Sequence, residues 1–230
     1  FGSETCSTVT TRGIYANDAE KGYLQAYDLN QPGWGVFAEE GWKAIADRPF
    51  MAGTFVWTGF DYRGEPTPYK WPCINSHFGI MDTCGFPKDN FFYYRARWSG
   101  ETVLHLLPHW NWPGREGETI PVWAHTNCEV VELFLNGESL GRRTLEPNSH
   151  LEWEVPYAPG VLLAKGYLGE TQVATATVET TGPAVALRLT PHLPTVAADG
   201  EDVCVITCSV HDADGRVMPV ADDHVTFSVS

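Results

Sequence analysis

The chain has 230 residues, of which 43% are hydrophobic and 13% aromatic, and its formal net charge is −14. This composition excludes a disordered chain and supplies enough apolar side chains for one large or two smaller packed domains. The negative charge disfavours nucleic acid and anionic lipid surfaces as partners, and no apolar run approaches the ~20 residues of a membrane helix. We therefore expect a globular protein with a neutral or cationic partner.

The first segment, residues 1 to about 98, combines helical and strand patterns. Residues 37–47 (FAEEGWKAIAD) have the spacing of an amphipathic helix, residues 50–57 (FMAGTFVW) form an apolar run, and 88–98 (KDNFFYYRARW) predict a second helix. A buried strand next to helices is typical of a parallel α/β sheet covered on both faces. The irregular stretch 61–79 between strand and helix contains three prolines, and a loop of that length is usually functional.

From about residue 101 the pattern changes to short alternating strands. Six strands are predicted at 118–126, 129–135, 138–145, 150–157, 160–168 and 171–180. Asn136-Gly137 between two of them is a strong hairpin signal. This spacing indicates an antiparallel β-sandwich over residues 101–181. Residues 184–230 begin a second set of strands that stops in mid-strand, so we expect the sequence to be cut at both ends.

The six cysteines lack CxxC or Cys/His ligand spacing, so the sequence predicts no zinc site and no other metal. We expect them to be buried free thiols rather than disulfides, which leaves the cellular compartment open. The cluster HLLPHWNW (His105, His109, Trp110, Trp112) invites a metal or sugar-platform interpretation. Packing between the first segment and the sandwich is the favoured interpretation, because two histidines without a third ligand hold zinc poorly.

Candidate chemistry lies where predicted parallel strands end, since catalytic groups of such barrels sit at the carboxyl ends of the strands. Glu4 follows one such strand, and Trp57 with Asp61, Tyr62 and Glu65 follows another. An indole face packs against a sugar ring while carboxylates accept hydrogen bonds from hydroxyls. On pattern alone, rim packing of Trp57 and a solvated Glu4 are the competing interpretations.

Four blocks carry a resemblance to a known family: FGSETCSTVTTRG, FMAGTFVWTGFDYRGEPTPY, FGIMDTCGFPKDNFFYYRARW and VLHLLPHWNWPGREGETIPVWAHTNCEVVELFLNGESLG. Together they resemble the C-terminal part of glycoside hydrolase family 2, in its bacterial β-galactosidase-like branch, over nearly the whole chain. The resemblance implies a multi-domain α/β plus all-β protein. Residues 1–98 would be the last quarter of a (β/α)8 TIM barrel, 101–181 an Ig-like antiparallel β-sandwich, and 184–230 the start of a second one.

The resemblance also implies a retaining exo-β-glycosidase without a cofactor, in which one carboxylate attacks the sugar and another acts as acid/base. Glu4 stands at the position of the nucleophile, Trp57 at that of the wall of the sugar subsite, and Asp61 and Tyr62 are candidate sugar contacts. The family's acid/base residue belongs to an Asn-Glu pair, which this sequence does not contain. We expect the chain alone to be inactive for that reason.

The expected substrate is a terminal β-galactoside, with β-glucuronide or β-mannoside specificity as alternatives. Family β-glucuronidases read the uronate with an Asn-x-Lys motif, and the corresponding Asn75-Ser76-His77 lacks the lysine. A different class of function is a non-catalytic sugar-binding or structural β-sandwich module. Oligomerisation stays open, and a periplasmic or secreted location is slightly favoured.

Overall fold

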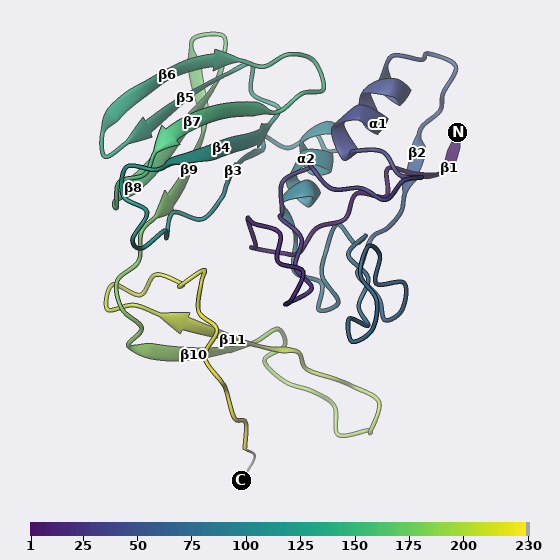
Figure 1. Ribbon diagram of the computed structural model, residues 1–230, viewed down its shortest axis with the longest axis vertical. Helices are drawn as coiled ribbons and strands as arrows, with labels where there is room; N and C mark the ends of the chain where they lie inside the picture. The colour runs from purple at the N-terminus through teal and green to yellow at the C-terminus, as the bar shows by residue number, and fades with distance from the viewer. Residues whose placement is uncertain (229–230) are drawn as a thin grey trace.

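The computed structural model describes residues 1–228, and it is mostly β-strand with two short helices (Figure 1). The helices are α1 (Ala38–Ala46) and α2 (Asp89–Trp98). The strands are β1 (Gly2–Thr5), β2 (Thr54–Val56), β3 (Leu104–Leu107), β4 (Thr119–Thr126), β5 (Val130–Leu135), β6 (Glu138–Thr144), β7 (Leu151–Pro156), β8 (Val161–Leu168), β9 (Thr171–Glu179), β10 (Ala186–Pro191) and β11 (Ile206–His211). Neither helix is long and apolar enough to cross a bilayer.

In the N-terminal segment, residues 1–98, β1 and β2 form a parallel two-stranded sheet beside the two helices (Figure 1). Both predicted helices are confirmed to within a residue. The apolar run at 50–57 differs from the expected buried strand, since β2 covers three residues and Phe50 and Phe55 are 81% and 66% exposed. The two helices cover only one face of this sheet, since Val56 packs against Ala38 and Tyr93 while its neighbour Phe55, on the opposite face, is exposed.

Helix α1 is capped by a carboxylate from another part of the chain. Phe37, at its N-cap, offers no side-chain acceptor. Asp28 supplies one instead, accepting hydrogen bonds from the backbone N–H groups of Ala38 and Glu39, each at 3.0 Å. Thr8 donates a third at 2.9 Å, so the Asp28 carboxylate joins α1 to the segment that follows β1.

Strands β3 to β9 form two antiparallel sheets that pack face to face, with orders β3-β4-β7 and β6-β5-β8-β9. The six predicted strands of residues 118–180 are confirmed as β4 to β9, and β3 was not predicted. The core between the sheets draws on both, with Trp110, Val122, Val131, Leu133 and Leu162 each completely buried. We call this unit the sandwich.

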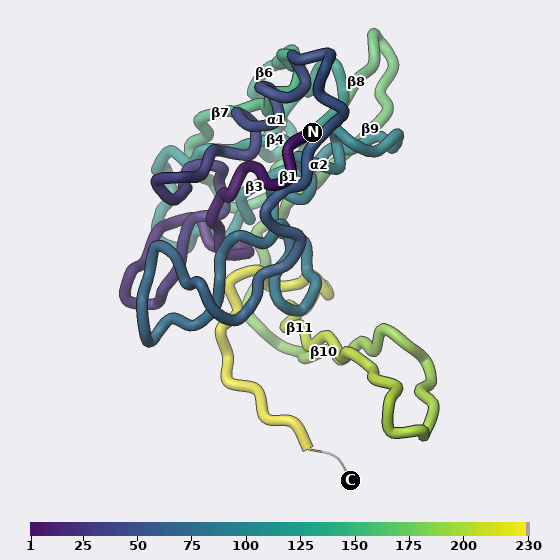
Figure 2. Tube along the Cα trace, turned by 90° about the vertical axis from the view of Figure 1, so that its right-hand side faces the viewer, coloured from purple at the N-terminus to yellow at the C-terminus, as the bar shows by residue number. Residues whose placement is uncertain are grey.

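The outer face of sheet β3-β4-β7 carries a row of three histidines. His105 and His125 are direct register partners with ring centroids 6.5 Å apart, and the His150 ring, just before β7, lies 6.0 Å from that of His125. Helices α1 and α2 lie beside this face of the sheet (Figures 1 and 2). The predicted packing role is confirmed for His105, which stacks on Phe92 of α2 at 3.8 Å, and for His109 and Trp112, which pack on Tyr15, whereas Trp110 belongs to the core of the sandwich.

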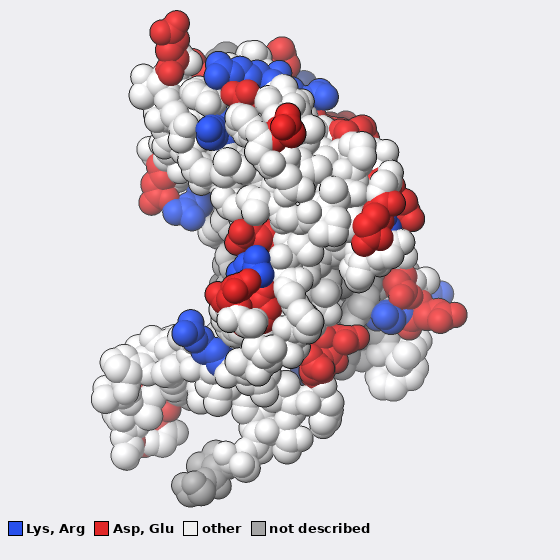
Figure 3. Space-filling view, turned by 90° about the vertical axis from the view of Figure 1, so that its left-hand side faces the viewer, with Lys and Arg blue, Asp and Glu red and all other residues white. Residues whose placement is uncertain are grey.

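The antiparallel pair β10 and β11 forms a separate small unit below the sandwich (Figures 1 and 2). Its apolar side chains are largely open, with Leu187 and Leu189 more than half exposed. The face shown in Figure 3 has few charged groups over this unit, whereas acidic and basic side chains are interspersed over the rest.

All six cysteines are free, and two of them, Cys6 and Cys128, are buried as predicted. Cys84 is exposed, and Cys73, Cys204 and Cys208 are partly exposed, so burial was predicted too broadly.

Candidate functional site

The parallel pairing of β1 and β2 brings Glu4 and Trp57 to one edge of the sheet. Thr5 is the register partner of Val56, and its carbonyl accepts a hydrogen bond from the Trp57 N–H at 2.9 Å. The hydroxyls of Thr5 and Thr54 add a contact of 2.6 Å between the strands. Glu4 was expected just after the strand but lies within β1, as the third of its four residues, and it is exposed near the carboxyl end of the strand.

Tyr62 connects the residues at this edge. Its hydroxyl accepts a hydrogen bond from Nε1 of Trp57 at 3.2 Å and donates one to Oε2 of Glu65 at 2.5 Å. Partial removal from water, the bond to Glu65 and the nearby charge of Glu4 raise the pKa of Tyr62 to about 12. The hydroxyl therefore stays protonated over the working pH range, and it can orient the Trp57 indole.

Asp61 is the one predicted sugar contact that the structure turns inward. Its side chain is 7% exposed, and it forms an ion pair of 2.8 Å with Lys88 while accepting the Gly79 N–H at 2.8 Å. Burial raises the pKa of Asp61, and the bonds from Lys88 and Gly79 oppose that effect. Direct sugar binding by Asp61 stays a prediction, and its observed contacts fix the loop that carries Tyr62.

The position where a uronate-reading lysine would stand is occupied by a buried, neutral imidazole. His77 is 5% exposed, and burial together with the charge of Lys88 lowers its pKa to about 4. Its ring nitrogens lie 3.4 Å from the Thr11 hydroxyl and 3.7 Å from the Cys73 thiol. The amide of Asn75 donates to the Ser76 carbonyl at 2.8 Å. His77 thus offers no positive charge to a carboxylate ligand at neutral pH.

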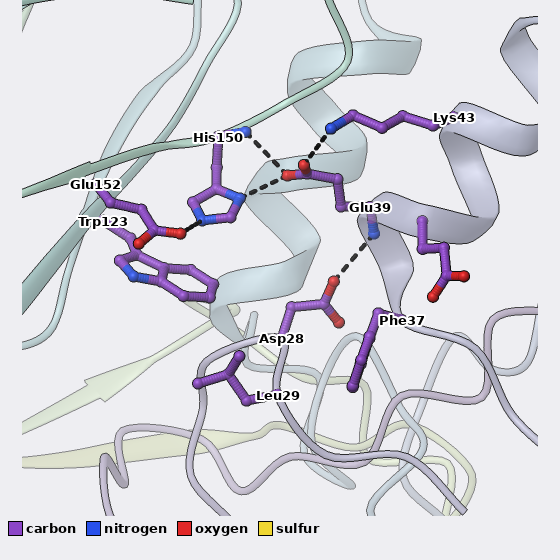
Figure 4. A pocket seen from close by; sticks show the side chains of 9 residues that line it. Asp28, Leu29, Phe37, Glu39, Lys43, Trp123, His150 and Glu152 are labelled. Carbon is purple, nitrogen blue, oxygen red and sulfur yellow. Dashed lines mark hydrogen bonds and ion pairs between the residues drawn. The ribbon is translucent and has the colours of Figure 1, made fainter. Parts of the chain in front are cut away.

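A cavity of ≈ 360 Å³ lies at the junction of α1 and the sandwich (Figure 4). Several of its polar groups pair with one another: Glu39 with His150 and Lys43, and His150 also with Glu152. The Trp123 indole is likewise occupied, because the His150 ring stacks on it at 4.0 Å. These pairs connect α1 to the residues at and just before β7, which supports a role in joining the two parts of the chain.

The structure brings Trp57 and Tyr62, which the sequence singled out as sugar contacts, into contact with each other and adds Glu65, to which the sequence gave no role; the sugar-binding roles stay predictions. It assigned Lys88 only to the start of a helix. Lysine is rarely buried, and the sequence alone gave no sign that Lys88 is 1% exposed. Within residues 1–228, no group of three or more His, Cys, Asp or Glu side chains is placed to hold a metal ion.

Comparison with known proteins gives the chain its family. Residues 187–230 match the model for glycoside hydrolase family 2 C-terminal domain 5, and residues 117–174 match a domain of unknown function (DUF4982). A β-galactosidase from Bacteroides ovatus is 39% identical over 99% of this chain, and a β-glucuronidase from Formosa agariphila is 29% identical over 84% of it. The crystal structure of a β-glycosidase from Bacteroides vulgatus, 32% identical, superposes on 93% of the chain and 31% of its own length with a TM-score of 0.83.

The chain belongs to glycoside hydrolase family 2. It spans 29% of the length of the Bacteroides ovatus relative and 20% of the Formosa agariphila one.

Proposed function

We propose that the chain is part of a retaining exo-β-glycosidase, in which Glu4 is the nucleophile and Trp57 walls the sugar subsite. The observation that carries the proposal is the parallel pairing of β1 and β2, which holds an exposed carboxylate and an oriented indole at the same edge. In this proposal residues 1–98 are the last quarter of a TIM barrel. The sandwich is Ig-like, and residues 184–230 begin a second Ig-like domain.

In the proposed mechanism the Glu4 carboxylate attacks the anomeric carbon and forms a glycosyl-enzyme, which water then hydrolyses. A separate acid/base carboxyl, supplied by a part of the enzyme outside these residues, protonates the leaving oxygen. Without that group the reaction forfeits typically ~10²–10⁴-fold in rate. The chain alone is therefore expected to bind sugar weakly and to turn it over very slowly.

The nucleophile is tested by Glu4→Gln in the complete enzyme. Turnover of an aryl β-galactoside should be lost while substrate binding persists, and a small external nucleophile such as azide should restore part of the activity. Glu138→Gln, on exposed strand β6, is the matched control and should be as active as wild type. Full activity in Glu4→Gln would refute the assignment.

The proposed substrate is a neutral β-galactoside rather than a β-glucuronide. Support comes from His77, whose buried imidazole is neutral, and from Lys88, whose ammonium is already paired with Asp61. The β-galactosidase from Bacteroides ovatus is also the more similar of the two relatives compared above. Comparing kcat/KM for aryl β-galactoside, β-glucuronide and β-mannoside tests the choice, and a preference for the uronide or the mannoside would overturn it.

The alternative of a sugar-binding sandwich has less support. Trp110, Trp123 and Trp153 are 0%, 5% and 3% exposed, so these three indoles do not offer a face to a glycan. Retention of residues 101–230 on a β-galactan gel would favour this alternative.

A further inference from the structure

Lys88 carries a charged side chain that is almost completely buried, at 1% exposed. Its Nζ donates to the carbonyl of Thr10 at 2.7 Å and to that of His77 at 3.2 Å. The third partner is Asp61, whose two carboxylate oxygens lie at 2.9 and 2.8 Å. The three N–H donors of the ammonium are therefore all used.

These partners lie on three separate segments, and each segment supports the proposed site. Thr10 is in the segment that leaves the Glu4 strand, and Asp61 immediately precedes Tyr62. His77 precedes Phe78, whose carbonyl accepts the N–H of Thr58, the residue next to Trp57, at 3.1 Å. One buried cation thus connects the nucleophile strand to the loops that hold the subsite wall.

The backbone around this cation is closely packed. A Cβ added at Gly79 would lie 2.1 Å from the Asp61 nitrogen, so glycine is required where the two loops meet. The backbone N–H of Lys88 itself bonds to the Ile80 carbonyl at 2.9 Å, which fixes the start of α2 relative to the same loop. The backbone that carries the Lys88 side chain is therefore held firmly against this loop.

Stability alone does not explain a charge in this place. A buried ion pair pays a large desolvation cost, and replacing it with apolar groups of similar volume often leaves a protein equally or more stable. What apolar groups cannot reproduce is the simultaneous, directional bonding of three segments. A displacement of about 1 Å in a catalytic site can reduce the rate by ~10²-fold.

We propose that Lys88 is a positioning residue of the glycosidase site, which sets the Glu4 strand and the Trp57–Tyr62 loop in register through Thr10, Asp61 and His77. The inference rests on the proposed function. It extends the site to a residue that does not contact the sugar.

The test uses the complete enzyme and 2-deoxy-2-fluoro-β-galactosyl fluoride, whose transfer to Glu4 forms the C1–Oε bond, releases fluoride and leaves a long-lived ester detectable by mass spectrometry. Labelling of Glu4 in the wild type tests the proposed function by itself. Failure of labelling there would remove the proposed function, whatever Lys88 does.

Lys88→Met/Asp61→Asn removes the ion pair without leaving an unpaired buried charge, so it is the variant expected to fold. Its labelling rate and its kcat for an aryl β-galactoside should both fall by about ten- to a hundred-fold, with a smaller change in KM and a melting temperature close to that of the wild type. Asp61→Asn alone keeps the ammonium and its carbonyl partners, so it should be faster than the double variant. Arg12→Gln, which breaks the half-exposed Arg12–Asp82 ion pair of 2.7 Å, is the matched control and should be labelled at the wild-type rate.

A double variant labelled as fast as the wild type would overturn the inference. Equal rates in Asp61→Asn and the double variant would also overturn it, because the effect would then belong to Asp61. A rate loss shared by Arg12→Gln would show that any weakened loop contact suffices, and that result too would count against Lys88.

Discussion

His150 and Glu39 join the sandwich to helix α1 through two hydrogen bonds to one carboxylate oxygen. The backbone N–H of His150 lies 2.9 Å from Oε2 of Glu39, and its Nδ1 lies 2.5 Å from the same atom (Figure 4). Nε2 of the same ring contacts Glu152 at 2.7 Å. Burial lowers the pKa of His150, but the two carboxylates outweigh burial and leave the pKa raised. A protonated imidazolium fits this place, since both ring nitrogens then donate.

His150→Gln should therefore weaken the junction. Losing one partner of a partly buried hydrogen-bonded pair costs ~1–3 kcal/mol, and each kcal/mol lowers the melting temperature of a chain of this length by about 2–4 °C. Because the pKa of His150 is raised in the folded state, its protonated form stabilises the fold. This stabilisation is fully present below the unfolded pKa of 6.5 and is lost as the pH rises through the folded pKa. The deficit of His150→Gln, measured by thermal melts, should thus be largest at pH 5–6 and shrink above pH 7. The exposed His192→Gln is the control, and a deficit that grows with pH would contradict the ion pair.

His125 should show the opposite behaviour. It is 2% exposed, and neither ring nitrogen has a hydrogen-bond partner among the described residues. Burial first, and then the charges of His105 and His150, lower its pKa well below 6.5. The unfolded chain takes up a proton below pH 6.5 while the folded chain does not, so this group destabilises the fold as pH falls. His125→Leu should raise the melting temperature increasingly from pH 7 to pH 5, and a gain independent of pH would refute the explanation.

Asp28 offers a test of the cap on α1. Asp28→Ala removes the acceptor for the N–H groups of Ala38 and Glu39 and should cost about 1–2 kcal/mol. Asp28→Asn keeps one acceptor oxygen and should lose roughly half as much. Hydrogen exchange of the first turn of α1 is the measurement, and equal protection in Asp28→Ala and wild type would show that the cap contributes nothing.

Tyr62→Phe tests whether the Trp57 indole is oriented by the tyrosine hydroxyl. The change deletes the acceptor for Nε1 of Trp57 and the donor to Glu65. In the complete enzyme we expect kcat/KM for an aryl β-galactoside to fall about ten-fold, which corresponds to the net value of one or two hydrogen bonds. Tyr167→Phe in the sandwich is the control. An unchanged kcat/KM in Tyr62→Phe would mean that packing alone holds the indole.

The elements that sequence predicted correctly are those with a clear periodicity. Strand β7 is the clearest case, since its residues are alternately buried and exposed. Strand β3 was missed because His105 faces helix α2 instead of water, so both of its faces are covered and its pattern is irregular. The strand at 50–57 was predicted too long because an apolar run does not reveal how many neighbours are present to bury it.

The residues of the candidate site likewise include some that sequence patterns indicate and some that they do not. Glu4 and Trp57 were singled out because predicted strands end near them, and the structure places Glu4 in β1 and Trp57 directly after β2. Asp61 was predicted as a sugar contact because it follows Trp57 in a loop where the family resemblance implies an acidic residue. Its partner Lys88 lies at the start of α2, and local sequence does not connect the two. Bonds to the Thr10 and His77 carbonyls depend on backbone positions, which side-chain patterns do not encode.

The distribution of free thiols gives the chain built-in reporters of local opening. Cys6, 3% exposed, lies in the N-terminal segment, and Cys128, 1% exposed, lies in the sandwich, while Cys84 is open to solvent. A thiol reagent will modify Cys84 at once and will reach the two buried sulfurs only when their surroundings open. Following the three alkylation rates by peptide mass spectrometry would therefore time the opening of each half separately in a single unlabelled sample.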